Sequence, residues 1–404
     1  MALDRRWFYL ALFWLVNFSL GSFYAWSVYS SWLAEHYSLI SQITVTASSL
    51  TFVFSIGAAC NPVSMVAAGY LNDRFGPRIV LVVGGAVSAL GYFLMSLSTD
   101  SSLLLIGYGI CLGMGSGACV IATVSSAVKM FPEMRGLAGG SVGTSYGIGS
   151  VCLPPLANYL AQQFGIIVTL QIFAVACLIV IWTAASLVSS KALGKTGSAV
   201  SAQMTDELDW QAMIKTPRFY AMFALFIVGT LSPLMLFSQT VSIAREQVNL
   251  PLALAVLSVS ILALANTSAR LLAGALSDKI GRVNTLMISV ILAIVGLFFL
   301  SISAPGQSGL FFTGLICIGA CFGSCVGVFP SYTAEQFGPR NASMNYGILA
   351  LAFSVAGILG PNIIQLTVQD GQYQAAYYTA MAISSMGLIA AYFCRKFERK
   401  LPTQ

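Results

Sequence analysis

Twelve long apolar stretches occupy most of this 404-residue chain, and they constrain its fold more than any other feature. A helix that crosses the hydrocarbon core of a bilayer needs about 20 mostly apolar residues. Only 8% of the residues are charged, far fewer than in soluble proteins. We therefore predict an all-α membrane protein with twelve transmembrane helices, and a soluble enzyme or a nucleic-acid-binding protein fits this composition poorly. The predicted spans cover residues 7–32, 46–71, 79–98, 103–128, 136–160, 165–188, 218–243, 252–276, 284–303, 309–333, 341–367 and 375–394.

The basic residues are distributed unevenly between the two ends of these spans. The chain has nineteen Lys and Arg residues. Arg270 falls inside a span and Arg245 lies on one side of the membrane, and the other seventeen share the opposite side. The positive-inside rule makes that side cytoplasmic. We therefore expect both termini to be cytoplasmic in a bacterial inner (plasma) membrane. The first apolar run, Trp7 to Leu33, is too long for a signal peptide.

A tandem repeat divides the chain into halves. The segment GYLNDRFGPR at 69–78 follows the second span, and GALSDKIGR at 274–282 follows the eighth. We predict a six-helix bundle at 1–188, a cytoplasmic linker at 189–216 and a second six-helix bundle at 217–404. Glycines at every fourth residue, which allow helices to approach closely, are matched between the halves: Gly109, Gly113 and Gly117 against Gly319, Gly323 and Gly327.

The repeated segment resembles the signature between helices two and three of the major facilitator superfamily. This resemblance covers the whole chain and implies two pseudo-symmetric six-helix bundles that alternate access about a central cavity. An acidic residue at a cytoplasmic helix end can pair with basic groups and with a neighbouring helix terminus, which would make a latch between conformations. The alternative is that the segment only directs topology. The expected latch residues are Asp73, Arg74, Arg78, Asp278, Lys279 and Arg282.

Arg270 is the one ionisable residue that this assignment places within a span. An arginine at a helix centre costs at least ~2.5 kcal/mol on insertion scales, and such residues usually face a bundle interior and mark a substrate path. The guanidinium matches a carboxylate in bidentate fashion, which favours a small carboxylic acid as substrate over a sugar or a cationic drug. The alternative is snorkelling, because Arg270 lies about 9 Å from the predicted end of its span.

Several further segments are similar to the oxalate/formate antiporter family, which is related to the monocarboxylate transporters. They are GSFYAWSVY at 21–29, TPRFY at 216–220, NTSAR at 266–270 and NYG at 345–347. The resemblance implies that Tyr24, Tyr146 and Arg270 contact substrate and that Phe322 replaces a tryptophan. Three further contact positions of this family differ here: Phe353 stands where the oxalate carrier has a second basic residue, and Val120 and Val326 stand where it has tyrosines.

One cation suits one carboxylate, so lactate or pyruvate fits better than oxalate, whose second charge would be costly in an apolar cavity. We expect a secondary active transporter, not an enzyme, that carries such acids by proton symport. Asn266 lies one turn before Arg270 and is expected to steer it or the substrate, while Phe322 and Phe353 form an apolar wall. Monocarboxylate transporters commonly have an aspartate in place of Asn266, so the group that carries the proton stays open.

Two other functions are kept as alternatives: an anion exchanger of the oxalate/formate type, and a membrane receptor that does not transport. We expect the carboxylate, a proton and the lipid bilayer as partners, no nucleic acid, and a monomer. No cofactor or metal is expected. Cys317, Cys321 and Cys325 recur every fourth residue but spread over roughly 12 Å of helix axis, too far for one zinc ion.

Overall fold

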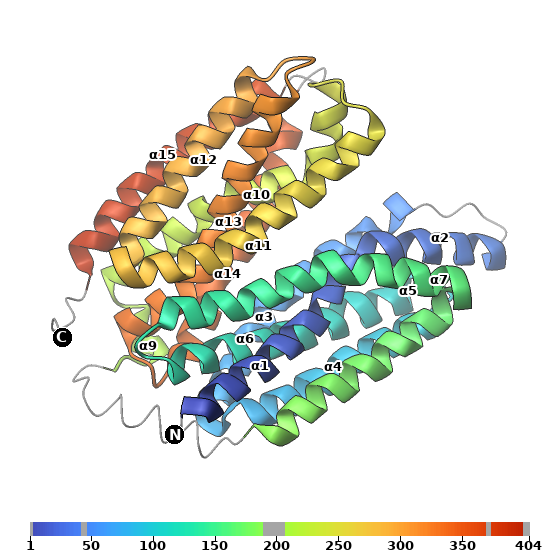
Figure 1. Ribbon diagram of the computed structural model, residues 1–404, viewed down its shortest axis with the longest axis horizontal. Coiled ribbons are helices and arrows are strands. Elements are labelled where there is room, and N and C mark those ends of the chain that lie inside the picture. Colours follow the sequence, from blue (N-terminus) through green and yellow to red (C-terminus); the bar gives the residue numbers. More distant parts are fainter. Residues whose placement is uncertain (1–2, 42–46, 189–206, 369–372, 399–404) are drawn as a thin grey trace. The chain divides into compact units, whose positions relative to one another are not determined.

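The computed structural model describes residues 3–41, 47–188, 207–368 and 373–398, and every regular element in these ranges is a helix (Figure 1). The predicted all-α class is confirmed. Residues 189–206 of the predicted linker at 189–216 lie outside the described residues. The short helix α9 (Trp210–Met213) occupies part of its remainder.

The helices form two compact units, each of which contains one half of the chain and a short segment of the other half. Unit 1 comprises residues 1–132, 145–207 and 339–348, and unit 2 comprises residues 133–144, 208–338 and 349–404. The first turns of α7 thus belong with unit 2, and the first two turns of α14 belong with unit 1. The predicted bundle boundaries do not include this exchange and stay a prediction.

The elements of the first half are α1 (Leu3–Leu20), the 3₁₀-helix η1 (Gly21–Ala25), α2 (Trp26–Ser41), the 3₁₀-helix η2 (Ala47–Leu50), α3 (Thr51–Phe75), α4 (Pro77–Leu97), α5 (Ser101–Leu104), the π-helix η3 (Leu105–Leu112), α6 (Gly113–Met130) and α7 (Arg135–Leu187). Those of the second half, after α9, are α10 (Pro217–Glu246), α11 (Leu252–Ile280), α12 (Arg282–Ile302), α13 (Ser308–Phe337), α14 (Ala342–Thr367) and α15 (Gln374–Phe397).

Eleven helical segments of the described residues are long and apolar enough to cross a membrane. One of them, α7, has 53 residues and is interrupted at Gly165, whose φ of 78° and ψ of 164° are not helical. Its two parts correspond to the fifth and sixth predicted spans, so the eleven segments supply the twelve predicted crossings. The first crossing is longer than the predicted 7–32, because α1, η1 and α2 follow one another to Ser41.

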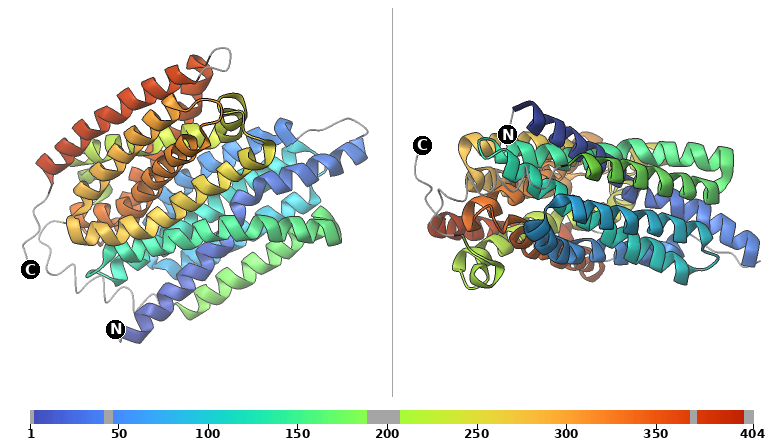
Figure 2. Two further views of the ribbon diagram at one scale, coloured as in Figure 1. Left: turned by 45° about the horizontal axis from the view of Figure 1, so that its top comes forward. Right: turned by 90° about the horizontal axis from the view of Figure 1, so that it is seen from below.

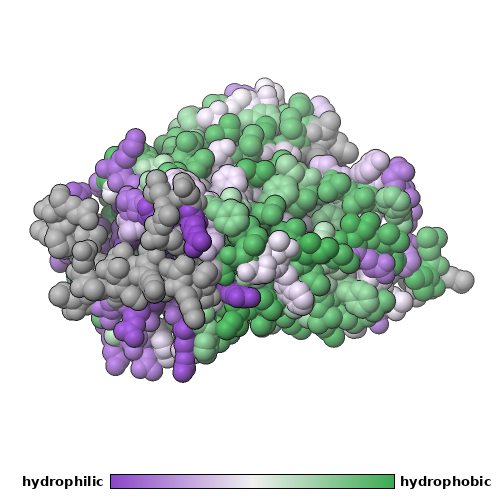
Figure 3. All heavy atoms as spheres, turned by 60° about the horizontal axis from the view of Figure 1, so that its bottom comes forward, coloured by the Kyte–Doolittle hydropathy of each residue, from purple (hydrophilic) through white to green (hydrophobic). Residues whose placement is uncertain are grey.

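Corresponding helices pack alike within the two units. In unit 1, α6 packs against α3 and α4, and in unit 2, α13 packs against α11 and α12. Figure 2 shows these helices from two further directions. The outward faces are apolar, as Figure 3 shows for one side, where hydrophilic residues gather mainly toward one end. Exposed leucines such as Leu272, at 67% exposure, suit contact with lipid.

Close glycine contacts set the register of the repeat and correct the predicted one. An added Cβ at Gly113 would lie 2.7 Å from the Gly57 carbonyl oxygen, and one at Gly319 would lie 2.7 Å from that of Leu262. One turn later, Gly117 meets the Asn61 carbonyl oxygen and Gly323 meets that of Asn266. Gly113 therefore corresponds to Gly319 and Gly117 to Gly323, one helical turn away from the predicted matching.

The repeated segment is the end of a helix and not a loop. Helix α3 continues through Asp73 to Phe75, and α11 continues through Asp278 to Ile280. A single glycine then separates each helix from the next, Gly76 with φ 82° and Gly281 with φ 91°. Only glycine adopts this backbone region without strain. The two aspartates therefore lie on rigid helix ends.

Candidate functional site

Arg270 lies on α11 in unit 2 and is buried, with 7% of its surface exposed. Its Nε donates a hydrogen bond to Asn266 Oδ1 at 3.2 Å, and its Nη1 donates to the carbonyl oxygen of Gly143 at 2.9 Å. The predicted proximity of Asn266 and Arg270 is thus present as a direct contact. The amide fixes one edge of the guanidinium, and a backbone carbonyl from α7 fixes another.

The snorkelling alternative does not fit this geometry. Arg270 lies ten residues before Ile280, the last residue of α11, which is roughly 15 Å at helical rise. The side chain also points the other way, because Asn266 is one turn further from that end. The burial cost of this charge is therefore met inside the helix bundle.

Small residues bring α7 close enough to reach Arg270. A Cβ added at Gly140 would collide with the carbonyl oxygen of Arg270, and one added at Gly136 would collide with that of Gly274. Thr144 Oγ1 donates to the carbonyl oxygen of Thr267 at 3.3 Å in the same contact. The first three turns of α7 therefore form one wall of the arginine site within unit 2.

The predicted tyrosines lie together in unit 1. The rings of Tyr24 and Tyr146 meet edge to face, with centroids 5.8 Å apart. Tyr24 is on η1, and a Cβ added at Gly21 of the same turn would lie 2.6 Å from the backbone of Gly149. This glycine crossing brings η1 against α7. Tyr24 is 42% exposed and Tyr146 is 8% exposed.

The predicted apolar wall is also a contact pair. Phe322 on α13 and Phe353 on α14 stack with their ring centroids 5.8 Å apart, and Phe237 lies 5.6 Å from Phe322. Phe322 is buried and Phe353 is half-buried. These three rings belong to unit 2, like Arg270, and they add no charge.

The repeat places a neutral residue where unit 2 has its arginine. The carbonyl oxygen of Arg270 faces Gly140 of α7, and the carbonyl oxygen of Met65 faces Gly347 of α14 in the same way. One turn earlier, Asn61 corresponds to Asn266 and donates to Ser116 Oγ at 2.8 Å. The duplicated scaffold therefore carries a cation at this position in one unit and a thioether in the other.

Asp73 caps a helix in unit 1. Its two oxygens accept hydrogen bonds from the backbone amides of Ser343 at 3.2 Å and Met344 at 2.8 Å, in the first turn of α14. Lys129 at the end of α6 pairs with the same carboxylate at 2.5 Å. A carboxylate at a helix N-terminus is stabilised by the orphan amides and the helix dipole.

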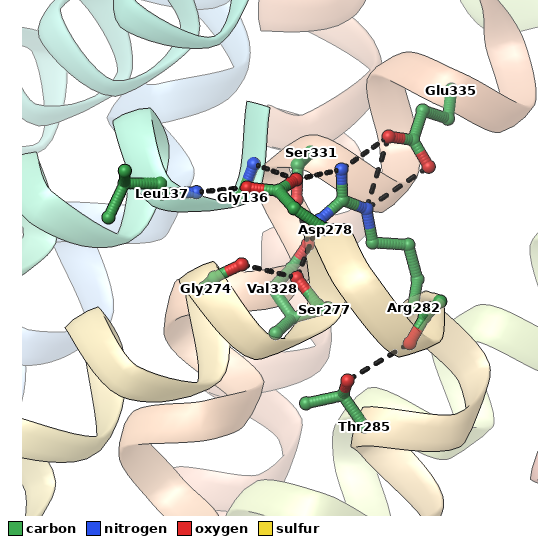
Figure 4. A network of polar contacts seen from close by, with 11 residues as sticks. Gly136, Leu137, Gly274, Ser277, Asp278, Arg282, Thr285, Val328, Ser331 and Glu335 are labelled. Carbon is green, nitrogen blue, oxygen red and sulfur yellow. Dashed lines mark hydrogen bonds and ion pairs between the residues drawn. The ribbon is translucent and has the colours of Figure 1, made fainter. Parts of the chain in front are cut away.

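Asp278 does the same in unit 2, with a larger charge cluster (Figure 4). It accepts from the backbone amides of Gly136 at 2.9 Å and Leu137 at 2.8 Å, in the first turn of α7. Arg282 pairs with Asp278 at 2.7 Å and with Glu335 of α13 at 2.5 Å. Beside this cluster, burial and then the charge of Glu335 raise the pKa of Glu398 above its ordinary value.

The six predicted latch residues thus have different surroundings. Asp73, Asp278 and Arg282 lie in the two clusters, whereas Arg74, Arg78 and Lys279 are exposed. Arg74 donates to Tyr70 Oη at 2.9 Å. Sequence reasoning missed Lys129 and Glu335, which occupy corresponding places near the ends of α6 and α13. No shared sequence signal marks them, because one is basic and the other is acidic. A latching role for these residues stays a prediction.

The capping role of Asp278 predicts a loss of stability in Asp278→Asn. An amide keeps one acceptor oxygen but places an N–H group against backbone donors and Arg282, so we expect a loss of about 2 kcal/mol. For a cooperative unit of about 200 residues, this corresponds to a melting temperature lower by roughly 4 to 8 °C. A thiol-reactive dye can follow unfolding, because Cys119, Cys177 and other free cysteines are buried. Lys279→Gln, next to it and exposed, is the control, and equal melting of the two variants would contradict the capping role.

Comparison with known proteins agrees with this architecture. Residues 11–361 match the family described as Major Facilitator Superfamily. The chain is 30% identical over 355 residues to an uncharacterised MFS-type transporter, YhjX, of Escherichia coli, covering 87% of this chain and 86% of that protein. It is 28% identical to the oxalate:formate antiporter of Oxalobacter formigenes, covering 97% and 92%. It is 25% identical to monocarboxylate transporter 13 of Bos taurus, covering 84% and 79%.

Solved structures give the same fold. The crystal structure of the transporter FucP in its outward conformation matches with a TM-score of 0.70 and 14% identity, covering 97% of this chain and 99% of that one. A double tryptophan mutant of XylE matches with a TM-score of 0.73 and 16% identity, covering 98% and 97%. The predicted major facilitator fold is therefore confirmed, and the chain is a multi-pass integral membrane protein. The helix repeat, the helix-end aspartates and these matches together show that it is a transporter of the major facilitator superfamily.

Proposed function

We propose that this transporter carries small monocarboxylates, of the size of L-lactate or pyruvate, and that Arg270 binds the carboxylate. The observation that carries the proposal is the buried guanidinium, held at one edge by Asn266 and at another by the Gly143 carbonyl. Asn266 and the Gly143 carbonyl are neutral groups that orient the guanidinium. A bound carboxylate would form the charge-assisted pair that a buried arginine favours.

Two features support one carboxylate over two. The repeat-matched position of unit 1 holds Met65, and the position that is basic in oxalate carriers holds Phe353. Phe322 and Phe353 offer an apolar surface for a short tail. Tyr24 and Tyr146 stay in the proposal as substrate-contacting residues through the family resemblance. Charge neutralisation at Arg270 would make an occluded state easier to reach, because a paired charge needs less hydration.

Proton symport is our proposed coupling, in a bacterial inner membrane with both termini in the cytoplasm and a monomer as the working unit. Anion exchange is the second candidate, because a relative that covers 97% of this chain is an oxalate:formate antiporter. These modes differ in what drives uptake. A symporter accumulates substrate along a proton gradient, whereas an exchanger needs an anion on the far side.

Uptake of labelled L-lactate into proteoliposomes tests the proposal. We expect an inward proton gradient to drive accumulation into vesicles without internal anion, and a proton ionophore to abolish it. Uptake that requires internal oxalate or formate would replace symport by exchange. If the vesicles take up neither lactate nor pyruvate under any of these conditions, the proposed substrate class is wrong. The alternative of a membrane receptor that does not transport would then be favoured. Protein-free vesicles are the control.

A further inference from the structure

An apolar groove lies on the outer face of unit 2, between the first turns of α10 and the last turns of α15. The alanines Ala224 and Ala390 lie among larger lining side chains, including Tyr220, Ile389, Phe393 and Phe397. Small side chains between large ones leave a hollow along the helix pair. Tyr220 is 62% exposed and Ile389 is 58% exposed, so the groove is open to the surroundings of the protein.

In a bilayer, hydrocarbon occupies such a groove. Both helices are among the membrane-crossing segments, and a cleft between lipid-facing helices has no water to fill it. Its lining residues are almost all apolar, which matches an acyl chain. The tyrosine hydroxyl of Tyr220 stands near the start of α10, where amphipathic rings commonly mark the membrane interface.

Basic residues surround the same end of the groove. Lys215 is exposed and lies two residues before Pro217, where α10 begins. Lys396 is exposed in the last turn of α15, and its Nζ lies 5.9 Å from the ring centroid of Phe397, which lines the groove. The nearby carboxyl of Glu398 is accompanied by Arg395, so Lys215 and Lys396 leave this end of the groove positively charged.

We propose that this groove binds an anionic phospholipid, with one acyl chain between α10 and α15 and the phosphate at Lys215 and Lys396. Basic sites between transmembrane helices at the cytoplasmic surface suit such head groups. Phosphatidylcholine carries a positive charge beside its phosphate, so it gains less from these two cations. The proposal is independent of the substrate that the transporter carries.

Native mass spectrometry of the full chain in detergent tests the proposal. We expect phosphatidylglycerol to form a one-lipid complex at concentrations at least about tenfold below those needed for phosphatidylcholine with the same acyl chains, since each basic residue near a head group contributes roughly fivefold. The double variant Lys215→Gln/Lys396→Gln should lose most of this preference. Arg5→Gln, which removes an exposed charge at the start of α1, should keep it.

Two further measurements test the acyl-chain groove and the head-group contacts separately. Ala224→Trp fills the groove and should weaken the phosphatidylglycerol complex while Lys215 and Lys396 both remain. Inorganic phosphate, which lacks acyl chains, should not displace the lipid at equal concentration. Equal binding of the two lipids, an unchanged preference in the double variant, or displacement by phosphate would each overturn the proposal. A variant is included in the comparison only if its melting temperature matches that of the parent protein.

Discussion

Replacing Arg270 with alanine is expected to abolish carboxylate uptake in proteoliposomes. The variant removes the buried guanidinium that Asn266 and Gly143 orient, so the carboxylate would enter without a counter-charge. Truncating one partner of a buried charge pair costs about 2–5 kcal/mol, which predicts uptake reduced at least ~30-fold. Arg270→Lys should recover part of the activity, because a lysine keeps the charge but lacks the planar fork.

The control for Arg270→Ala is Met65→Ala, at the repeat-matched position of unit 1. Met65 is also buried, at 5% exposure, so this variant removes a side chain from an equivalent helix position without removing a charge. We expect it to retain uptake. Both proteins should elute as single species in detergent and melt close to the parent. Normal uptake by a folded Arg270→Ala protein would exclude the proposed carboxylate site.

Local helix geometry accounts for the parts of this site that the sequence predicted. Asn266 and Arg270 are four residues apart, and residues at this spacing share one face of a helix, so their contact follows from α11 alone. The Gly143 carbonyl could not be predicted in the same way. It reaches Arg270 only because Gly136 and Gly140 let α7 approach α11, which is a property of tertiary packing.

The register of the repeat could not be predicted from the sequence, for a different reason. Glycines at every fourth residue look the same after a shift of four, so sequence matching could not choose between two alignments of α6 with α13. The backbone oxygens that they contact resolve this, because Asn61 and Asn266 each face one specific glycine. The helix-end aspartates were recognisable from the repeated motif. Lys129 pairs with Asp73, whereas Glu335 pairs with Arg282 beside Asp278. These two residues come from other helices and carry opposite charges, so no common pattern pointed to both.

Phe353→Lys is expected to change the charge of the preferred substrate. Phe353 stacks on Phe322 in the same unit as Arg270, and a lysine there would supply a second cation where oxalate carriers have one. Couplings between close charge pairs are about 1.5–7 kcal/mol, so oxalate should compete with labelled lactate at concentrations lower by at least ~10-fold. Lactate uptake should fall, because its apolar end would face a charge.

The matched control is Phe353→Leu, which removes the stacked ring and keeps the apolar character. We expect it to leave the order of preference unchanged, with lactate above oxalate, so that a reversal in Phe353→Lys reports the charge and not the loss of the ring. Competition is measured at one pH with the same vesicles, and folding is checked by melting. If oxalate competes no better in the lysine variant than in the leucine variant, the number of cations does not set the selectivity, and the shape of the aromatic wall becomes the determinant to test.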